Sequence, residues 1–457
     1  MATAPRADGP RVAGVAVAFD PAVLTPDPGP RADVLAALSG ALAAADPAAA
    51  VRRSLRRRGG RLWVAGARMR LPRGRVVVLG LGKAAVAMAG AALEALEGVE
   101  VTGAIAVPAA TGPVGPLQAI TGGHPSPDAG SLAAGRRLLD LAGEAGADDL
   151  VLVLVSGGGS ALAEVPAPGL TLEDLVSANV ALVCSGAPIT AVNTVRRHLS
   201  ALKGGRLAEA AAPARLATLV VSDVVGSPLA AIAGGPTVPD PTTYADALSI
   251  LEKGRMHVPP AVLAVLRDGA GGRRPETPEG GPAFGGPVVI ATDGPTAARG
   301  AAAAAASRGI AARVCSTTVE GEARLVGTRL GEAARLLAPG EMEVHAGETT
   351  VTVAGQGKGG RNQEVALAAG MTLAGDPGRS LVASFATDGV DGPTDAAGGI
   401  GDAGTTGRGL DRSLDAAVCL AGNDSYRYLA AVGGLLRCGP TGTNVGDVMI
   451  AYRPRRT

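Results

Sequence analysis

The segment Arg75–Ala85, with the sequence RVVVLGLGKAA, decides the fold class of this chain. Its first part, Arg75–Leu79, is an almost unbroken apolar run, which is typical of a strand buried on both faces. Glycines end the strand, and Lys83 then precedes an Ala/Met/Leu segment that predicts a helix to about Leu96. A strand that passes through a glycine turn into a helix is the alternation expected of an α/β fold.

The same alternation continues along the chain and restarts after a Gly/Pro-rich stretch at residues 268–286. It predicts an α/β fold with two α/β domains and largely parallel sheets. We expect an N-terminal tail over residues 1–30, a first domain over 31–267, a linker over 268–286 and a second domain over 287–453. The second domain is expected to begin with a strand at residues 287–291.

Composition argues against several classes of function. The 457 residues are 47% hydrophobic, which is enough for packed cores, but only 2% aromatic. With a net charge of +1 there is neither a basic field nor a stacking surface for nucleic acid. No apolar run approaches the ~18 residues of a membrane helix, so we expect no membrane partner. Four scattered cysteines without a C-x-x-C pair favour a reduced, cytoplasmic setting.

Two glycine loops follow predicted strands, where α/β folds bind ligands. The loop at residues 80–85 presents Lys83 at a helix N-terminus, which favours an anion. It also fits a loose dinucleotide pattern, but Glu100, the acidic residue at the right spacing, precedes the next strand. The loop Ser156–Ser160 can form an anion-binding nest. It lacks the last glycine of a G-x-S-x-G elbow, so a serine hydrolase is disfavoured and a flexible turn stays open.

A third glycine loop and a group of acids complete the candidate chemistry. Residues 355–364 combine four glycines with Lys358 and Arg361, which suits phosphate or carboxylate. Asp223, Asp388 and Asp391 follow strands and could present a carboxylate to magnesium or to a substrate hydroxyl, although Asp is also an ordinary turn residue. Cationic glycine loops together with strand-end acids favour phosphoryl transfer.

These motifs, in this order, resemble the glycerate 2-kinase family with a C-terminal MOFRL domain, over about residues 31–453. The matching segments are Gly80–Ala84, Gly122–Pro125, Val155–Ala161, Asn193–Arg196, Lys203–Gly205, Gly347–Thr350, Gly359–Glu364, Thr387–Thr394, Asn423–Ser425 and Gly442–Asp447. The resemblance implies two α/β domains with the active site in the cleft between them. It also implies a kinase that uses ATP and Mg²⁺ to phosphorylate the 2-hydroxyl of D-glycerate, giving 2-phosphoglycerate and ADP.

The family's catalytic lysine and arginine fall on Lys83 and Arg361, and we expect Asp223 to be a third catalytic group. Asp388 and Asp391 are the expected metal ligands. The expected substrate- and nucleotide-binding residues are Gly82, Ser156, Gly157, Gly158, Gly159, Ser160, Asn193, Gly360, Asn362 and Gln363. The expected partners are a small hydroxy acid and a nucleotide. A homodimer is compatible with the sequence, which does not fix the oligomeric state.

One segment departs from the family pattern. The family has S-D-V-P-G-D-D where residues 222–228 are SDVVGSP, so Ser227 and Pro228 stand in place of two acids, and Gly234 replaces a serine. This departure predicts slower turnover or a preference for a close analogue of D-glycerate. Two rival hypotheses stay open: a hydroxypyruvate/glycerate oxidoreductase with a nicotinamide cofactor, and a non-catalytic anion-binding paralogue.

Overall fold

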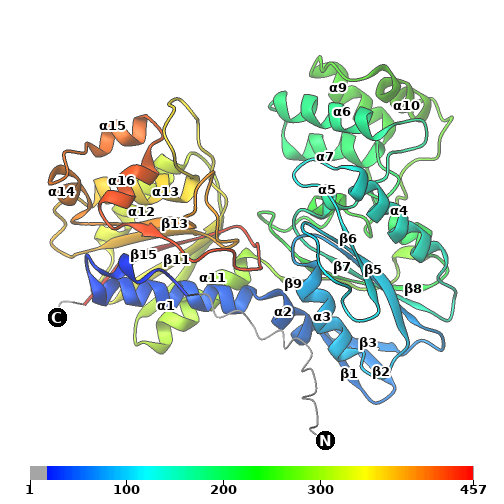
Figure 1. Cartoon of the computed structure of the whole chain (residues 1–457), viewed down its shortest axis with the longest axis horizontal. Coiled ribbons are helices and arrows are strands. Elements are labelled where there is room, and N and C mark those ends of the chain that lie inside the picture. The colour runs from blue at the N-terminus through cyan, green and yellow to red at the C-terminus, as the bar shows by residue number, and fades with distance from the viewer. Residues whose placement is uncertain (1–17, 456–457) are drawn as a thin grey trace, which may run out of the picture.

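The computed structural model describes residues 18–455, in which two six-stranded sheets form the centres of two α/β domains (Figure 1). The first sheet is parallel throughout, in the order β6-β5-β4-β7-β8-β9. Its strands are β4 (Val76–Leu81), β5 (Val101–Val107), β6 (Leu117–Thr121), β7 (Leu150–Val155), β8 (Arg215–Val221) and β9 (Val288–Thr292). The α/β architecture expected from the sequence is therefore confirmed.

Helices bury both faces of this sheet, which explains its unbroken apolar strands. Along β4, Val76 and Val78 pack into one core cluster, whereas Val77 and Leu79 pack into the other. The covering helices are α2 (Pro47–Ser54) and α3 (Ala85–Ala95) on one face, and α4 (Ala129–Gly143) and α8 (Arg206–Ala211) on the other. A small antiparallel sheet, formed by β1 (Leu55–Arg58), β2 (Arg61–Val64) and β3 (Ala67–Arg70), adjoins this domain.

A helical layer stands beyond the carboxyl ends of the first sheet, next to α5 (Gly159–Leu162) (Figure 1). It has a hydrophobic core of its own, which includes Val195, Tyr244 and Val262. Its helices are α6 (Leu172–Cys184), α7 (Ile189–His198), α9 (Tyr244–Lys253) and α10 (Pro260–Ala270). Single turns of 3₁₀ helix lie at η1 (Pro21–Leu24), η2 (Ile232–Gly234) and η3 (Pro282–Phe284).

The second sheet is mixed rather than largely parallel, with the order β10-β11-β15-β12-β13-β14. Only β10 and β11 are parallel, because the last strand of the chain, β15, is inserted antiparallel between β11 and β12. The strands are β10 (Ala311–Val319), β11 (Glu341–Gly347), β12 (Leu381–Ala386), β13 (Gly398–Asp402), β14 (Leu435–Leu436) and β15 (Asp447–Arg453). Its helices are α1 (Pro28–Ala45), α11 (Gly294–Ser307), α12 (Ala323–Leu336), α13 (Arg361–Thr372), α14 (Thr405–Leu410), α15 (Ala416–Ala421) and α16 (Ser425–Ala431).

Two segments lie elsewhere than the sequence predicts. The strand expected to open the second domain is β9, which pairs with β8 at the edge of the first sheet. The helix α1 was expected in the first domain but packs along α11 against the second sheet (Figure 1). Both assignments follow from long-range packing, which local sequence does not encode.

Residues 268–286 do not join the domains. Glu276 accepts hydrogen bonds from the Tyr244 N–H, and the Thr277 hydroxyl donates to the Thr242 carbonyl, so this stretch packs on the first domain. The described chain instead passes between the domains at Asp46, between α1 and α2, and at Asp293, between β9 and α11. The two crossings touch, because the Thr292 hydroxyl donates to the Ala44 carbonyl over 3.3 Å.

Among residues 18–455, no single helix has the length and apolar character needed to cross a membrane. The pair α1 and α2 meets the test together, on length and composition alone, but it is bent by 49° at the break.

Arg31 fixes α1 to the second domain and supplies a test of this arrangement. It is fully buried, and its guanidinium lies 2.5 Å from Asp402 and donates to the Val23 and Gly433 carbonyls. Because Arg31→Met leaves a buried carboxylate with one fewer cation, we expect a loss of about 3–5 kcal/mol of stability in urea unfolding followed by circular dichroism. Arg52→Met, which breaks the exposed pair with Glu94, should cost less than about 1 kcal/mol. Equal losses would contradict the anchoring role.

Candidate active site

The first domain contributes three loops from adjacent strand ends. Lys83 follows β4, the Ser156–Ser160 loop follows β7, and Asp223 follows β8. Since β4, β7 and β8 are neighbours in a parallel sheet, their carboxyl ends emerge side by side. The three loops predicted to carry chemistry in this half of the chain therefore meet.

Close backbone contact fixes the first two loops against each other. The Lys83 N–H donates to the Gly157 carbonyl over 2.9 Å, and the Ala84 N–H donates to Ser156 Oγ over 3.0 Å. Gly82 has φ +126°, and a Cβ there would lie 2.2 Å from Ser156 Oγ, so only glycine fits. Ser156 is buried and serves this contact, whereas Lys83 is exposed.

The glycine loop is surrounded by ionisable side chains. A Cβ on Gly157 would lie 2.1 Å from the Asp223 carboxylate, and one on Gly158 would lie 3.1–3.2 Å from the His124 ring and the Lys83 stem. Within the described chain, the N–H groups of Gly157 and Gly158 donate to no protein acceptor. Free N–H groups beside a lysine are what an anion site requires.

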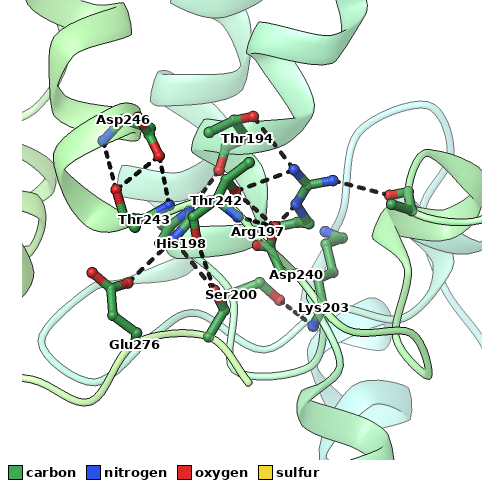
Figure 2. Close-up of polar contacts among 12 residues, drawn as sticks. Thr194, Arg197, His198, Ser200, Lys203, Asp240, Thr242, Thr243, Asp246 and Glu276 are labelled. Atoms are coloured by element: carbon green, nitrogen blue, oxygen red, sulfur yellow. Dashed lines mark hydrogen bonds and ion pairs between the residues drawn. The ribbon is translucent and has the colours of Figure 1, made fainter. Parts of the chain in front are cut away.

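A buried ion pair lies just beyond the glycine loop in the chain. Glu164, two residues after α5, pairs with Lys203, and the side chains are 1% and 2% exposed. The Ser200 hydroxyl donates to the other Glu164 oxygen over 2.6 Å. Lys203 lies near a wider network in which Arg197 reaches Asp240 over 3.0 Å (Figure 2). Through Ser200 and Lys203, the loop after α7 is therefore bonded to Glu164 in the segment that follows α5.

The second domain contributes Arg361, the first residue of α13. Its Nε and Nη2 donate to the two oxygens of Asp447 over 2.6 and 2.9 Å, and its Nη1 lies 2.8 Å from Glu348. Asp447 is fully buried at the start of β15, and Glu348 follows β11. Because a guanidinium has five N–H groups, two remain for a ligand. The paired carboxylates hold the pKa of Arg361 above its usual value despite burial.

Charges from the two domains act on one another across a narrow crevice. Burial raises the pKa of Asp223; Lys83 opposes this rise, and Asp388 from the second domain adds to it. Burial also raises the pKa of Glu348; Arg361 opposes this rise, and Asp447, Asp223 and Asp388 add to it. Where the domains meet, the crevice is lined by residues 223–226, 294–295 and 445–446, together with Thr317 and Gly347.

Several predicted binding residues have internal partners instead. Asp391 is 2% exposed, and its carboxylate accepts from the backbone and side-chain N–H groups of both Asn362 and Gln363. A Cβ on Gly360 would overlap the same carboxylate at 2.3 Å. Asp391 therefore fixes the N-terminus of α13, as an acid at a helix start does, and its oxygens are occupied. Asn193 is buried in α7, and no polar contact among residues 18–455 joins it to the glycine loop.

Sequence reasoning missed three contributors. It did not assign roles to Glu348 or Asp447, although both lie within motifs that carry the resemblance, Gly347–Thr350 and Gly442–Asp447. His124, which was assigned no catalytic role from the sequence, lies beside Lys83, and burial and that lysine lower its pKa. Glu348 and Asp447 could have been found from the sequence, because each is an acidic residue at the end or the start of a strand.

Comparisons with known proteins agree with the motifs. A family model described as Domain of unknown function (DUF4147) matches residues 33–267, and the MOFRL family matches residues 342–447. The glycerate 2-kinase of Pyrococcus horikoshii is 40% identical over 90% of this chain and 94% of that protein. An Agrobacterium vitis protein, whose name proposes a hydroxypyruvate reductase, is 39% identical over 89% of this chain and 91% of its own length. The crystal structure of a Thermotoga maritima glycerate kinase has a TM-score of 0.80 and 35% identity, covering 93% of this chain and 100% of that one.

The raised pKa of Asp223 predicts a stability effect with a definite pH dependence. A carboxyl whose folded pKa exceeds its unfolded value destabilises the fold above the folded pKa, and the penalty disappears as pH falls to about 4. Asp223→Asn should therefore raise Tm by about 2–4 °C near pH 8 and by much less near pH 4, as measured by calorimetry.

Asp128 is the matched control, because hydrogen bonds at the N-terminus of α4 lower its pKa. Asp128→Asn should give no gain in Tm near pH 8. A Tm for Asp223→Asn that is unchanged or lower near pH 8 would contradict the electrostatic description of the cleft.

Proposed function

The chain belongs to the family of glycerate kinases that combine a DUF4147 domain with a MOFRL domain, and on that premise we propose that it transfers the γ-phosphoryl group of ATP to the 2-hydroxyl of D-glycerate. It is thus a phosphotransferase with a small hydroxy acid and a nucleotide as substrates. The products would be ADP and 2-phosphoglycerate. The cytoplasmic setting is likewise a proposal and rests on the scattered cysteines of the sequence.

One observation carries the proposal: the N–H groups of Gly157 and Gly158, which have no acceptor within the described chain, lie beside Lys83. Phosphoryl transfer depends on positioning and on neutralising charge, and this arrangement supplies donors and a cation for an anionic group. We assign Lys83 and the two spare N–H groups of Arg361 to the transferring phosphoryl group.

The donor set also fits a divalent cation. Asp223, Glu348 and Asp388 are carboxylates whose charges act on one another, and hard oxygen ligands suit Mg²⁺. Asp391 does not fit, because its oxygens are already hydrogen-bonded at α13. We therefore assign Asp388 and Glu348 to the metal. When bound, Mg²⁺ supplies neutralisation of the phosphate charge.

Asp223 is the group we assign to the substrate hydroxyl. Its pKa is raised by burial, and a carboxylate with a raised pKa is a better proton acceptor than an ordinary one. The backbone of Gly157 lies against it, so the acceptor and the anion-binding N–H groups are held together. A hydroxy acid bound here would present its hydroxyl to Asp223 while its phosphoryl donor lies at Lys83.

The oxidoreductase hypothesis has weaker support. Glu100 directly precedes β5, at the amino end of the strand, whereas a ribose-binding acid belongs at the carboxyl end. Residues 108–112, which follow β5, are PAATG and contain no acid. The nucleotide loop at residues 80–85 therefore lacks the partner that a nicotinamide site needs.

The function is tested by measuring ADP release over a panel of 2-hydroxy acids, with phosphorus NMR of the product. We expect ADP formation with D-glycerate and a phosphate ester at carbon 2. Consumption of NADH with hydroxypyruvate and no ADP release would favour the oxidoreductase. Nucleotide binding without turnover on any acid would favour the non-catalytic alternative. Preference for another acid would connect Ser227 and Pro228 to specificity.

Lys83→Ala should lower kcat about a thousandfold without loss of the fold, because a cation facing the transferring group contributes on that order. The side chain is exposed, so little packing is lost. Steady-state kinetics with calorimetry checks both parts. Lys253→Ala, at the exposed end of α9, is the matched control and should retain wild-type kcat. Near-normal turnover in a folded Lys83→Ala protein would remove this residue from the mechanism.

A further inference from the structure

Three metal-binding side chain types converge on the edge of the second sheet, outside the proposed active site. Cys315 lies on β10, the edge strand, and Glu343 and His345 lie on the adjacent β11. One potential ligand atom from each residue lies within 4.8 Å of the others. The group is formed by a thiol, a carboxylate and an imidazole, which is not the oxygen-only set that Mg²⁺ prefers.

The sheet geometry accounts for the convergence. Glu343 and His345 are two residues apart on one strand, so they share a face of the sheet. On β10, Val314 pairs with Val344 and Ser316 pairs with His345, so the register shifts at the intervening Cys315. Such an irregularity leaves a residue outside the regular ladder and redirects its side chain. Cys315 is exposed, so the group is open to solvent on that side.

His345 supplies a second and independent observation. The residue is 9% exposed, and its Nε2 is buried without a hydrogen-bond partner. This nitrogen lies 3.5 Å from one oxygen of Glu343, while Arg313 donates to the other oxygen over 2.7 Å. An unsatisfied buried nitrogen is unfavourable, and coordination would satisfy it. A separation of 3.5 Å is also close to that between two ligands of one tetrahedral ion with bonds of about 2.0–2.2 Å.

We propose that Cys315, Glu343 and His345 form a zinc site with three protein ligands and a fourth position open to water. Thiolate, imidazole and carboxylate are the three ligand types that Zn²⁺ takes in proteins. On binding, the Cys315 thiol forms a metal–thiolate bond and releases its proton to solvent. The ion joins the edge strand β10 to β11, which continues through Gly347 to Glu348. None of its three ligands is a carboxylate proposed for magnesium, and one of those carboxylates, Glu348, directly follows β11.

Cobalt(II) is the probe that reports the thiolate directly. The metal-free full-length protein is titrated with Co²⁺ and then with Zn²⁺, with absorption spectra recorded throughout. We expect a thiolate-to-cobalt charge-transfer band that saturates at one equivalent and is lost when Zn²⁺ displaces Co²⁺. Cys315→Ser should lose the band, and His345→Gln should weaken binding at least about tenfold. Cys184→Ser, which changes an exposed cysteine on α6, should match the wild type.

Thermal unfolding gives a second readout, because a ligand that binds only the folded state raises Tm. Zn²⁺ should raise the Tm of the wild type and of Cys184→Ser, but not that of Cys315→Ser. A missing thiolate band in the wild type would overturn the proposal, as would a band that persists in Cys315→Ser. If His345→Gln does not fold, Cys315→Ser still decides, because the side chain removed is exposed. Since no substrate is present, failure here leaves the kinase proposal untouched.

Discussion

Burial of both faces of the parallel sheet is the constraint on which the rest of this molecule depends. Every residue of β4 and β7 is buried, so these strands have no position for a reactive side chain along their length. Polar chemistry is confined to the loops that leave their carboxyl ends. There the chain places glycines, because Gly82 and Gly157 must let neighbouring loops approach within contact distance. Lys83, His124 and Asp223 then lie around one short stretch of backbone.

The second domain faces this edge with a sheet of mixed strand direction. Because β11 and β15 are antiparallel, the end of one strand and the start of the other lie at the same edge. Glu348 follows β11 there, and Asp447 is the first residue of β15. Arg361 joins them, because its guanidinium is hydrogen-bonded to Asp447 and forms an ion pair with Glu348, which fixes its orientation before any ligand arrives. Preorganised charge of this kind does not have to reorient during a reaction. Asp391 accepts hydrogen bonds at the N-terminus of α13 and so fixes the helix turn that begins with Arg361.

The sequence was sufficient wherever the signal was local. The apolar run ending at Leu79 and the glycines after it predicted both the strand and the position of Lys83, because a buried strand and a glycine turn are properties of adjacent residues. It was insufficient wherever the partner is distant. The edge strand β9 pairs with β8 although α9 and α10 lie between them in the chain, and β15 enters the middle of a sheet begun more than a hundred residues earlier. Likewise, an aspartate in a glycine loop has the same local pattern whether it binds metal, as proposed for Asp388, or caps a helix, as Asp391 does.

The two segments where the chain passes between the domains determine the angle between the two sides of the cleft. Ala44, Ala45 and Thr292 lie at these crossings; the Ala45 carbonyl accepts from Thr443 over 2.8 Å, and the Ala44 carbonyl accepts from Thr292. Because α1 packs with α11 on the second domain, both crossings begin from the same packed pair of helices. Any change in the angle between the domains must therefore be taken up at these few residues. Within each domain, hydrogen bonds fix the backbone at Lys83, through its own N–H, and the guanidinium of Arg361, through Asp447. A change in domain angle would thus alter the separation between two prearranged sets of charges without disturbing either set.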